Sequence, residues 1–388
     1  MSDAPASLPL PPEIRTRFVD NANGLRMHVL EAGFDRGDRP GVLLLHGFPE
    51  LAYSWRHVML PLAQAGFHVF APDQRGYGRT TGWDGDYDGD VASFRLLNLA
   101  TDALGLVAAL GHRSVQAVVG HDFGAPVAAC CALARPDVFQ RVALMSAPFA
   151  GPPELPFDTA NSPAVEPLVD AAAGSDLHAD LAGLARPRKH YQWYYSTRGA
   201  ADEMRHCAQG VHAFLRAYYH HKSADWRGNR PFALGARTAA ELARLPDYYV
   251  MDLDKGMSET VAPQMPSAAE IAACRWLTEQ ELAVYSAEFA RTGFQGGLQW
   301  YRCQTDGTSS RDLRLFSGRS IDVPSCFIAG RSDWGPWQTP GALEAMQTHA
   351  CTKMQGCHWV EGAGHWVQQE QPAEVARLLL AFFRATAS

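Results

Sequence analysis

Short apolar runs alternate with helical patterns in both end regions of the chain, and this alternation restricts the possible folds most. Four runs in the first part are too short and too apolar for strands with one exposed face: residues 42–45, 68–72, 114–119 and 141–146. Helical patterns lie between them, at residues 55–65, 96–110 and 125–135. Gly66 and Gly111 end two of these patterns at a position suited to a left-handed cap. The pattern predicts an α/β fold with a mostly parallel central sheet covered by helices.

The alternation is interrupted once, at the proline-rich residues 151–156. A mostly helical section rich in aromatic residues follows to about residue 314. Strand and helix patterns then alternate again: a strand at 325–329, a helix near Leu343, a strand at 355–361 and a helix at 372–383. The simplest account is one α/β core made of residues 1–148 and 315–388, with a helical lid inserted at residues 149–314. No repeat with a period of about 20–50 residues recurs, which argues against a solenoid or a propeller.

Composition narrows the function classes. The chain of 388 residues has 34 basic and 41 acidic side chains, a net charge of −7, which argues against nucleic-acid binding. No apolar run approaches the roughly 18 residues of a membrane span, and residues 1–15 lack the basic start and apolar stretch of a secretory signal. The eight scattered cysteines indicate reduced thiols and a cytoplasmic protein. A bridge or a metal site at Cys351 and Cys357 is the alternative, but their spacing fits no zinc pattern, so we expect no metal.

The segment at residues 120–124, Gly-His-Asp-Phe-Gly, follows one predicted strand and opens the next helix. Small residues two positions before and after Asp122 are what a sharp turn from strand to helix requires. Such a turn presents its central side chain to a cleft and directs the first N–H groups of the helix to the same point. We therefore expect Asp122 to be a catalytic residue, although a tight turn with a solvated aspartate would show the same spacing.

Two further polar residues follow the last two predicted strands. Asp333 comes just after the strand at 325–329, and His365 comes just after the strand at 355–361. Because the carboxyl ends of parallel strands face one crevice, these residues can converge on Asp122. The chain order is nucleophile, acid, histidine. The sequence therefore predicts an Asp-His-Asp catalytic triad.

Several motifs connect these residues with a known family. Residues 46–50 read His-Gly-Phe-Pro-Glu, residues 73–78 read Asp-Gln-Arg-Gly-Tyr-Gly, and two aromatic segments lie in the lid at residues 191–195 and 294–302. Together with the triad, they resemble the soluble epoxide hydrolases within the epoxide hydrolase and haloalkane dehalogenase group of α/β-hydrolases. The resemblance runs from about Arg17 to Phe383. In that family, the segments that correspond to residues 191–195 and 294–302 supply the tyrosines that activate the epoxide. The resemblance therefore implies this role for Tyr191 and Tyr301.

The resemblance also implies an oxyanion hole, a pocket and partners. The oxyanion donors would be the backbone N–H groups of Phe48 and Phe123. The pocket residues would be His46, Pro49, Trp193 and Tyr195 from these motifs, together with Trp366, which follows His365. The expected partners are a small hydrophobic epoxide and water, with no cofactor, and the expected roles include detoxification. A homodimer is possible.

The residue types themselves select a reaction. A carboxylate is a poor nucleophile toward esters but can displace a leaving group from saturated carbon, which makes an ester of the enzyme. His365, oriented by Asp333, would then activate water to hydrolyse that ester. An opening epoxide needs a proton on its oxygen, and the phenols of Tyr191 and Tyr301 can supply it. The sequence therefore predicts an epoxide hydrolase that forms a vicinal diol.

Two other functions stay open from the sequence. A haloalkane or haloacid dehalogenase would use the same triad, but that branch takes halide donors from side chains at the positions of Phe48 and Phe123, which have none. Fluoroacetate dehalogenases carry an arginine after the nucleophile, where this chain has Phe123. A non-catalytic binding protein would usually have lost a member of the triad. An esterase would normally show serine at position 122.

Overall fold

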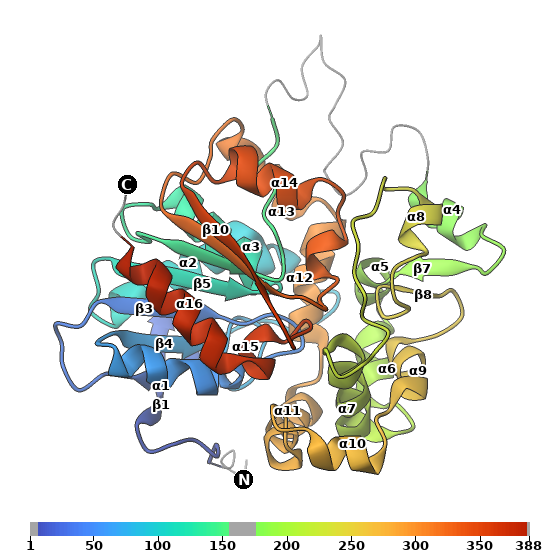
Figure 1. The fold of residues 1–388 in the computed structure, drawn as a ribbon, viewed down its shortest axis with the longest axis horizontal. Helices are drawn as coiled ribbons and strands as arrows, with labels where there is room; N and C mark the ends of the chain where they lie inside the picture. The colour runs from blue at the N-terminus through green and yellow to red at the C-terminus, as the bar shows by residue number, and fades with distance from the viewer. Residues whose placement is uncertain (1–6, 155–175, 386–388) are drawn as a thin grey trace.

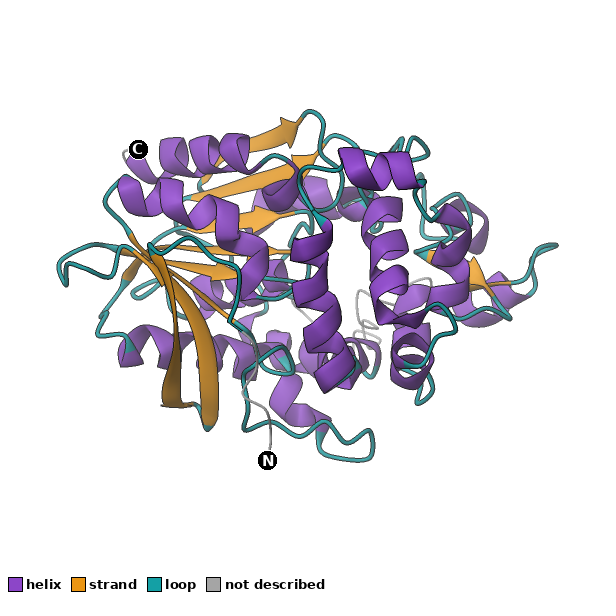
Figure 2. Ribbon diagram, turned by 90° about the horizontal axis from the view of Figure 1, so that it is seen from below, coloured by secondary structure: helices purple, strands orange, loops and turns teal. Residues whose placement is uncertain are grey.

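The structure, a computed structural model that describes residues 7–154 and 176–385, contains an eight-stranded sheet with helices packed on it (Figures 1 and 2). The strand order is β1-β2-β4-β3-β5-β6-β9-β10. Six strands of this sheet are parallel to one another: β4, β3, β5, β6, β9 and β10. Strand β2 runs antiparallel to both of its neighbours, β1 and β4. The bounds of the strands are β1 Ile14–Ala22, β2 Leu25–Ala32, β3 Gly41–Leu45, β4 His68–Pro72, β5 Val115–His121, β6 Val142–Met145, β9 Ser325–Gly330 and β10 Met354–Val360.

Apolar side chains from both faces of the sheet form the core. Along β3, Leu43 and Leu45 belong to one buried cluster, and Val42 and Leu44 belong to the cluster on the other face. Helices α2 (Leu96–Ala109) and α3 (Gly124–Ala134) pack in the first cluster, and α1 (Arg56–Gln64) and α16 (Pro372–Arg384) pack in the second (Figure 1). Burial on both faces explains why the strands read as continuous apolar runs.

The predicted core elements agree with the structure to within a few residues, and both predicted caps are present. Gly66 and Gly111 have φ angles of +102° and +85°. The residue after each glycine donates a backbone hydrogen bond five residues back, to Leu62 and Val107, which closes the helix end. The helix expected near Leu343 is a short α14 (Ala342–Ala345) continued by a π-helical turn, Met346–Ala350.

The antiparallel hairpin of β1 and β2 is absent from the sequence prediction. Most side chains of β1 are exposed, so the strand reads as polar, without the apolar run that marked the other strands. The pairing with β2 supplies the backbone partners that stabilise it. Such cross-strand partners are not visible in a local pattern.

Between β6 and β9, the described chain is mostly helical, as predicted. Two short antiparallel strands, β7 Arg188–His190 and β8 Val250–Asp252, lie among the helices. The helices are α4 Leu177–Ala182, α5 Tyr191–Tyr195, α6 Ala200–Arg205, α7 Gly210–Lys222, α8 Ala239–Leu242, α9 Met257–Val261, α10 Ala268–Ala273, α11 Glu279–Thr292, α12 Gln295–Thr305 and α13 Thr308–Leu313. Most of them lie to one side of the sheet (Figure 1).

Close backbone contact joins this helical section to the core. Gly76, in the loop after β4, lies against Gly296 of α12, and a Cβ on Gly76 would come within 2.5 Å of the Gly296 carbonyl oxygen. The Trp300 indole donates to the carbonyl of Arg75 at 2.9 Å, and the Tyr219 hydroxyl donates to that of Pro49 at 2.8 Å. These contacts lie at loops that follow the carboxyl ends of β3 and β4, so the helical section covers that edge of the sheet.

Three global properties follow from the described residues. No helix within residues 7–154 and 176–385 is long and apolar enough to cross a membrane. The same part of the chain contains no group of three or more His, Cys, Asp or Glu side chains placed to hold a metal ion. All eight cysteines, Cys351 and Cys357 included, have free thiols.

Candidate active site

Asp122 occupies a strained turn between β5 and α3. Its φ angle of +51° lies in the left-handed region, which non-glycine residues rarely adopt. A Cβ on Gly120 would overlap the carbonyl of Gly124, and a Cβ on Gly124 would overlap the carbonyl of Leu45. The turn therefore requires both glycines, and it leaves the Asp122 side chain 17% exposed in a cavity.

Asp333 and His365 meet Asp122 at this edge of the sheet. His365 Nδ1 lies 3.0 Å from Asp333 Oδ1, and His365 Nε2 lies 3.3 Å from Asp122 Oδ2. Asp333 Oδ1 also accepts the N–H of Gly335 at 2.7 Å. Burial opposes ionisation of Asp333, but His365 and this N–H hold the pKa of Asp333 below its ordinary value. Because a carboxylate only accepts hydrogen bonds, Nδ1 carries a proton, and Nε2 is the ring nitrogen that faces Asp122.

The Asp122 carboxylate is held in its ionised form. Burial alone would raise the pKa of Asp122, but His365, Lys222 and His121 together lower it well below its ordinary value. Asp122 Oδ1 accepts the backbone N–H of Phe48 at 2.9 Å. Gly47 permits this approach, because a Cβ there would overlap the Asp122 side chain. Phe123 stands at the N-cap of α3, where helical N–H groups begin.

Tyr191 and Tyr301 line the same cavity as Asp122, which has a volume of about 280 Å³. Tyr191 is the first residue of α5, Tyr301 lies on α12, and their ring centroids are 5.9 Å apart. Burial and then the Asp122 charge raise the pKa of both phenols well above 10. Both hydroxyls therefore keep their protons and can donate hydrogen bonds into the cavity.

The five residues expected to line the pocket do not line this cavity: His46, Pro49, Trp193, Tyr195 and Trp366. The ring of His46 accepts a backbone hydrogen bond beneath the site, and the hydroxyl of Tyr195 donates to that of Tyr218. Trp193 follows Tyr191 by two residues on α5, about 200° around the helix, and lines a separate surface hollow. The motif at residues 191–195 does contain a residue that lines the cavity, Tyr191, but the rotation of α5 about its axis determines that Trp193 does not.

A buried pair beneath the site, Glu50 and His121, was not predicted. Both side chains are inaccessible to solvent, and His121 Nδ1 lies 2.6 Å from Glu50 Oε2. His121 Nε2 lies 2.7 Å from the carbonyl of His365. Glu50 also accepts the N–H of Gly47 at 3.0 Å and the amide of Gln368 at 2.8 Å. The pair thus connects the nucleophile strand, the loop of Phe48 and the loop of His365.

The partners of His121 determine its charge. A carbonyl oxygen and an ionised carboxylate only accept, so both ring nitrogens donate and His121 is an imidazolium. Burial opposes both charges, yet Glu50 raises the pKa of His121 and His121 lowers the pKa of Glu50. The only sequence signals were the glutamate that ends the motif at 46–50 and the position of His121 beside Asp122.

Lys222, the last residue of α7, is a second unpredicted charge. Its side chain is buried, and its Nζ lies 4.9 Å from the ring centroid of Tyr249, 5.3 Å from that of Tyr218 and 5.4 Å from that of Trp366. Aromatic faces attract a cation at these distances. Its backbone carbonyl accepts the N–H of His365 at 2.9 Å. The helical section thus brings a positive charge close enough to act on Asp122.

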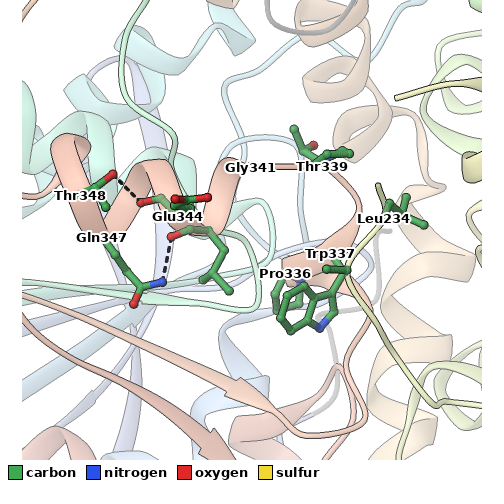
Figure 3. A pocket seen from close by; sticks show the side chains of 11 residues that line it. Leu234, Pro336, Trp337, Thr339, Gly341, Glu344, Gln347 and Thr348 are labelled. Carbon is green, nitrogen blue, oxygen red and sulfur yellow. Dashed lines mark hydrogen bonds between the residues drawn. The ribbon is translucent and has the colours of Figure 1, made fainter. Parts of the chain in front are cut away.

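A second cavity, of about 330 Å³, is lined in part by residues of the segment 336–341, which include Pro336 and Trp337 (Figure 3). Thr339 lines both cavities, whereas Trp337 lines only the second. Gln347 and Thr348 on its wall hydrogen-bond to carbonyls of their own helical segment. None of the three triad residues and neither tyrosine lines this cavity.

Comparisons with known proteins identify the family of the chain. A family model described as the alpha/beta hydrolase fold matches residues 40–372. Epoxide hydrolase A of Mycobacterium tuberculosis is 33% identical over 371 residues, which cover 94% of this chain and 96% of that protein. Epoxide hydrolase 3 of Siraitia grosvenorii is 30% identical, with 92% and 94% covered.

Solved structures give the same result. An epoxide hydrolase from an endophytic Streptomyces superposes with a TM-score of 0.74 at 32% identity, covering 96% of each chain. Epoxide hydrolase A from Mycobacterium thermoresistibile gives a TM-score of 0.72 at 30% identity, covering 96% of this chain and 98% of that one. The chain therefore belongs to the α/β-hydrolase fold family and, within it, to the epoxide hydrolases.

Proposed function

We propose that the protein converts a largely hydrophobic epoxide to a vicinal diol through a covalent ester of Asp122, without a cofactor. The observation that carries this proposal is that one cavity is lined both by the Asp122 carboxylate and by the phenols of Tyr191 and Tyr301. The carboxylate is the nucleophile and the phenols are the acids that epoxide opening needs. The named relatives support the reaction class.

In the first step, Asp122 Oδ2 attacks an epoxide carbon and the bond from that carbon to the ring oxygen breaks. Tyr191 and Tyr301 hydrogen-bond to the ring oxygen, and one of them transfers its proton to the alkoxide as it forms. Their raised pKa keeps that proton available at neutral pH. The product of this step is a hydroxyalkyl ester of Asp122.

In the second step, His365 Nε2 removes a proton from water, which attacks the carbonyl carbon of the ester. Asp333 orients the ring and stabilises the imidazolium that forms. The oxyanion develops on Oδ1, where the N–H of Phe48 already donates, and the N–H of Phe123 is the second donor. The tetrahedral intermediate then collapses, and its bond to the diol oxygen breaks. That oxygen takes the proton of the hydroxyl group that came from water, so the diol leaves and Asp122 is again a carboxylate. The proton on His365 returns to the phenolate.

The test is a substrate panel with the Asp122→Asn variant as control. The panel contains styrene oxide, trans-stilbene oxide, a terminal alkyl epoxide, 1,2-dibromoethane and fluoroacetate, and both diol and halide are measured. Diol formed by the wild type and lost in Asp122→Asn is the expected result. Diol formation that persists in Asp122→Asn would contradict the covalent mechanism.

A variant of His365 separates the two steps. His365→Gln should still be alkylated but should not hydrolyse the ester, so intact mass spectrometry should show the protein plus one substrate. Full turnover by this variant would remove His365 from the mechanism. Substitution of Tyr191 and Tyr301 by Phe should slow alkylation, and normal alkylation in the double variant would exclude both phenols.

The same panel distinguishes the alternatives. A dehalogenase would release halide without forming diol, although Phe48 and Phe123 offer no side-chain donors to a halide. A binding protein would bind epoxides but release neither product. A lid at residues 149–314, a cytoplasmic location, a homodimer and a detoxifying role stay predictions.

A further inference from the structure

The cavity around Asp122 contains a neutral polar patch that the proposed reaction does not use. The patch consists of the side chains of Gln304, Ser309 and Ser310, which line the cavity together with the reacting groups. Within residues 7–154 and 176–385, none of these three side chains makes a hydrogen bond with another protein group. Their donors and acceptors are therefore available to a molecule in the cavity.

The patch has a defined position relative to the phenols. Gln304 follows Tyr301 by three residues on α12, so it lies on the same helix face about 4.5 Å farther along the axis. Ser309 and Ser310 stand in the first turn of α13, which begins at Thr308. The patch therefore lies one helical turn or more beyond the point where the epoxide oxygen would bind.

The rest of the cavity wall limits what can reach this patch. Leu96, Phe123, Phe149 and Leu313 make much of the wall apolar. Among the described lining residues, the Asp122 carboxylate is the only charged side chain. A substrate with its own carboxylate would meet like charge, and no cationic side chain among the described lining residues would pair with it; a buried charge without a partner is costly.

We infer that the substrate is a neutral epoxide with a second hydrogen-bonding group, such as an amide or a hydroxyl, about four bonds from the epoxide oxygen, which binds Gln304, Ser309 and Ser310. The inference rests on the proposed epoxide hydrolysis and specifies its substrate class. Apolar atoms of the substrate contact the wall near the reacting carbon, and the polar group lies at the patch. Anionic epoxides are rejected.

Three matched substrates test this inference: 3-(oxiran-2-yl)propanamide, its carboxylate 3-(oxiran-2-yl)propanoate, and the apolar 2-butyloxirane. We measure kcat/KM for diol formation at neutral pH in the wild type and in Gln304→Leu and Ser310→Ala variants. The matched control is Gln347→Leu, the same change in the second cavity, where no reacting group lies (Figure 3). Turnover of 2-butyloxirane reports in each variant whether the active site is formed.

In the wild type we expect the amide to exceed the carboxylate at least tenfold in kcat/KM. We expect the ratio of amide to 2-butyloxirane to fall about fivefold in each of the Gln304 and Ser310 variants and to stay constant in Gln347→Leu. An unchanged ratio, or a preference for the carboxylate, would overturn the inference while diol from 2-butyloxirane leaves the proposed function intact. If no epoxide gives diol, the proposed function fails and this inference fails with it.

Discussion

Replacing His121 by Gln should destabilise the protein in a manner that depends on pH. A glutamine can still donate to the carbonyl of His365, but it removes the cation that faces Glu50. The Glu50 carboxylate, inaccessible to solvent, then has no counter-charge. It must either remain as an unpaired buried charge or take up a proton, and both options cost free energy of folding.

The structure and linkage set the size of this cost. In the wild type, His121 lowers the pKa of Glu50 against the effect of burial. Burial is the largest single effect on this pKa, and His121 is the largest of those that oppose it, so we expect the pKa of Glu50 to rise above its unfolded value of 4.5 when His121 is removed, although the N–H of Gly47 still lowers it. If Glu50 is protonated in the folded variant, folding at pH 7 costs up to about 3.4 kcal/mol, because each pH unit above 4.5 is worth about 1.36 kcal/mol. At pH 5 the same cost falls to about 0.7 kcal/mol.

A double variant, His121→Gln with Glu50→Gln, isolates the charge of Glu50. The single variant His121→Gln and the double variant both lack His121, so the difference between their unfolding free energies comes from position 50 alone. We expect the double variant to be the more stable at pH 7 by about 3 kcal/mol, or about 4 °C in Tm for a chain of this length, and by less than about 1 kcal/mol at pH 5. Urea unfolding followed by tryptophan fluorescence measures both. A gap that does not change between pH 5 and pH 7 would refute the buried ion pair.

Three further predictions test the electrostatics and the turn. Burial and the charge of Asp122 raise the pKa of Tyr191 and Tyr301, so neither phenol should ionise below about pH 10. Absorbance titration at 295 nm should therefore give the same curve below that pH for the wild type and for the variant with both tyrosines replaced by Phe. A titrating phenol that is present in the wild type and absent from the variant would contradict this. Lys222→Met should change Tm little, because the Met thioether can pack against the aromatic rings that now surround the cation. It should move the acidic limb of kcat/KM to higher pH, because the cation lowers the pKa of the nucleophile. A lower Tm with an unchanged pH profile would assign Lys222 a packing role only. Gly124→Ala should destabilise the protein by more than about 2 kcal/mol, because its Cβ overlaps a backbone carbonyl, whereas Gly105→Ala on α2, whose Cβ finds its nearest atom at 3.4 Å, should be neutral or stabilising in thermal unfolding.

The convergence of Asp122, Asp333 and His365 could be predicted from the sequence because it is a consequence of topology. Each residue follows the carboxyl end of a parallel strand, and these ends meet at one edge of the sheet whatever the details of packing. The same holds for the caps at Gly66 and Gly111, which depend only on local backbone conformation. Short apolar runs, helix ends and strand-end residues are local features, and the sequence by itself determined them.

Tertiary structure alone decided which other side chains reach the site. The contact of Glu50 with His121 joins residues 71 positions apart, and Lys222 reaches the site from the end of α7. The orientation of α5 turned Trp193 away from the cavity while Tyr191 faces it. Such contacts depend on how helices and loops rotate against one another. Many rotations of a helix bury a similar apolar area, so the hydrophobic pattern of the sequence does not distinguish them. The residues that line the cavity are therefore determined only when the whole chain has packed.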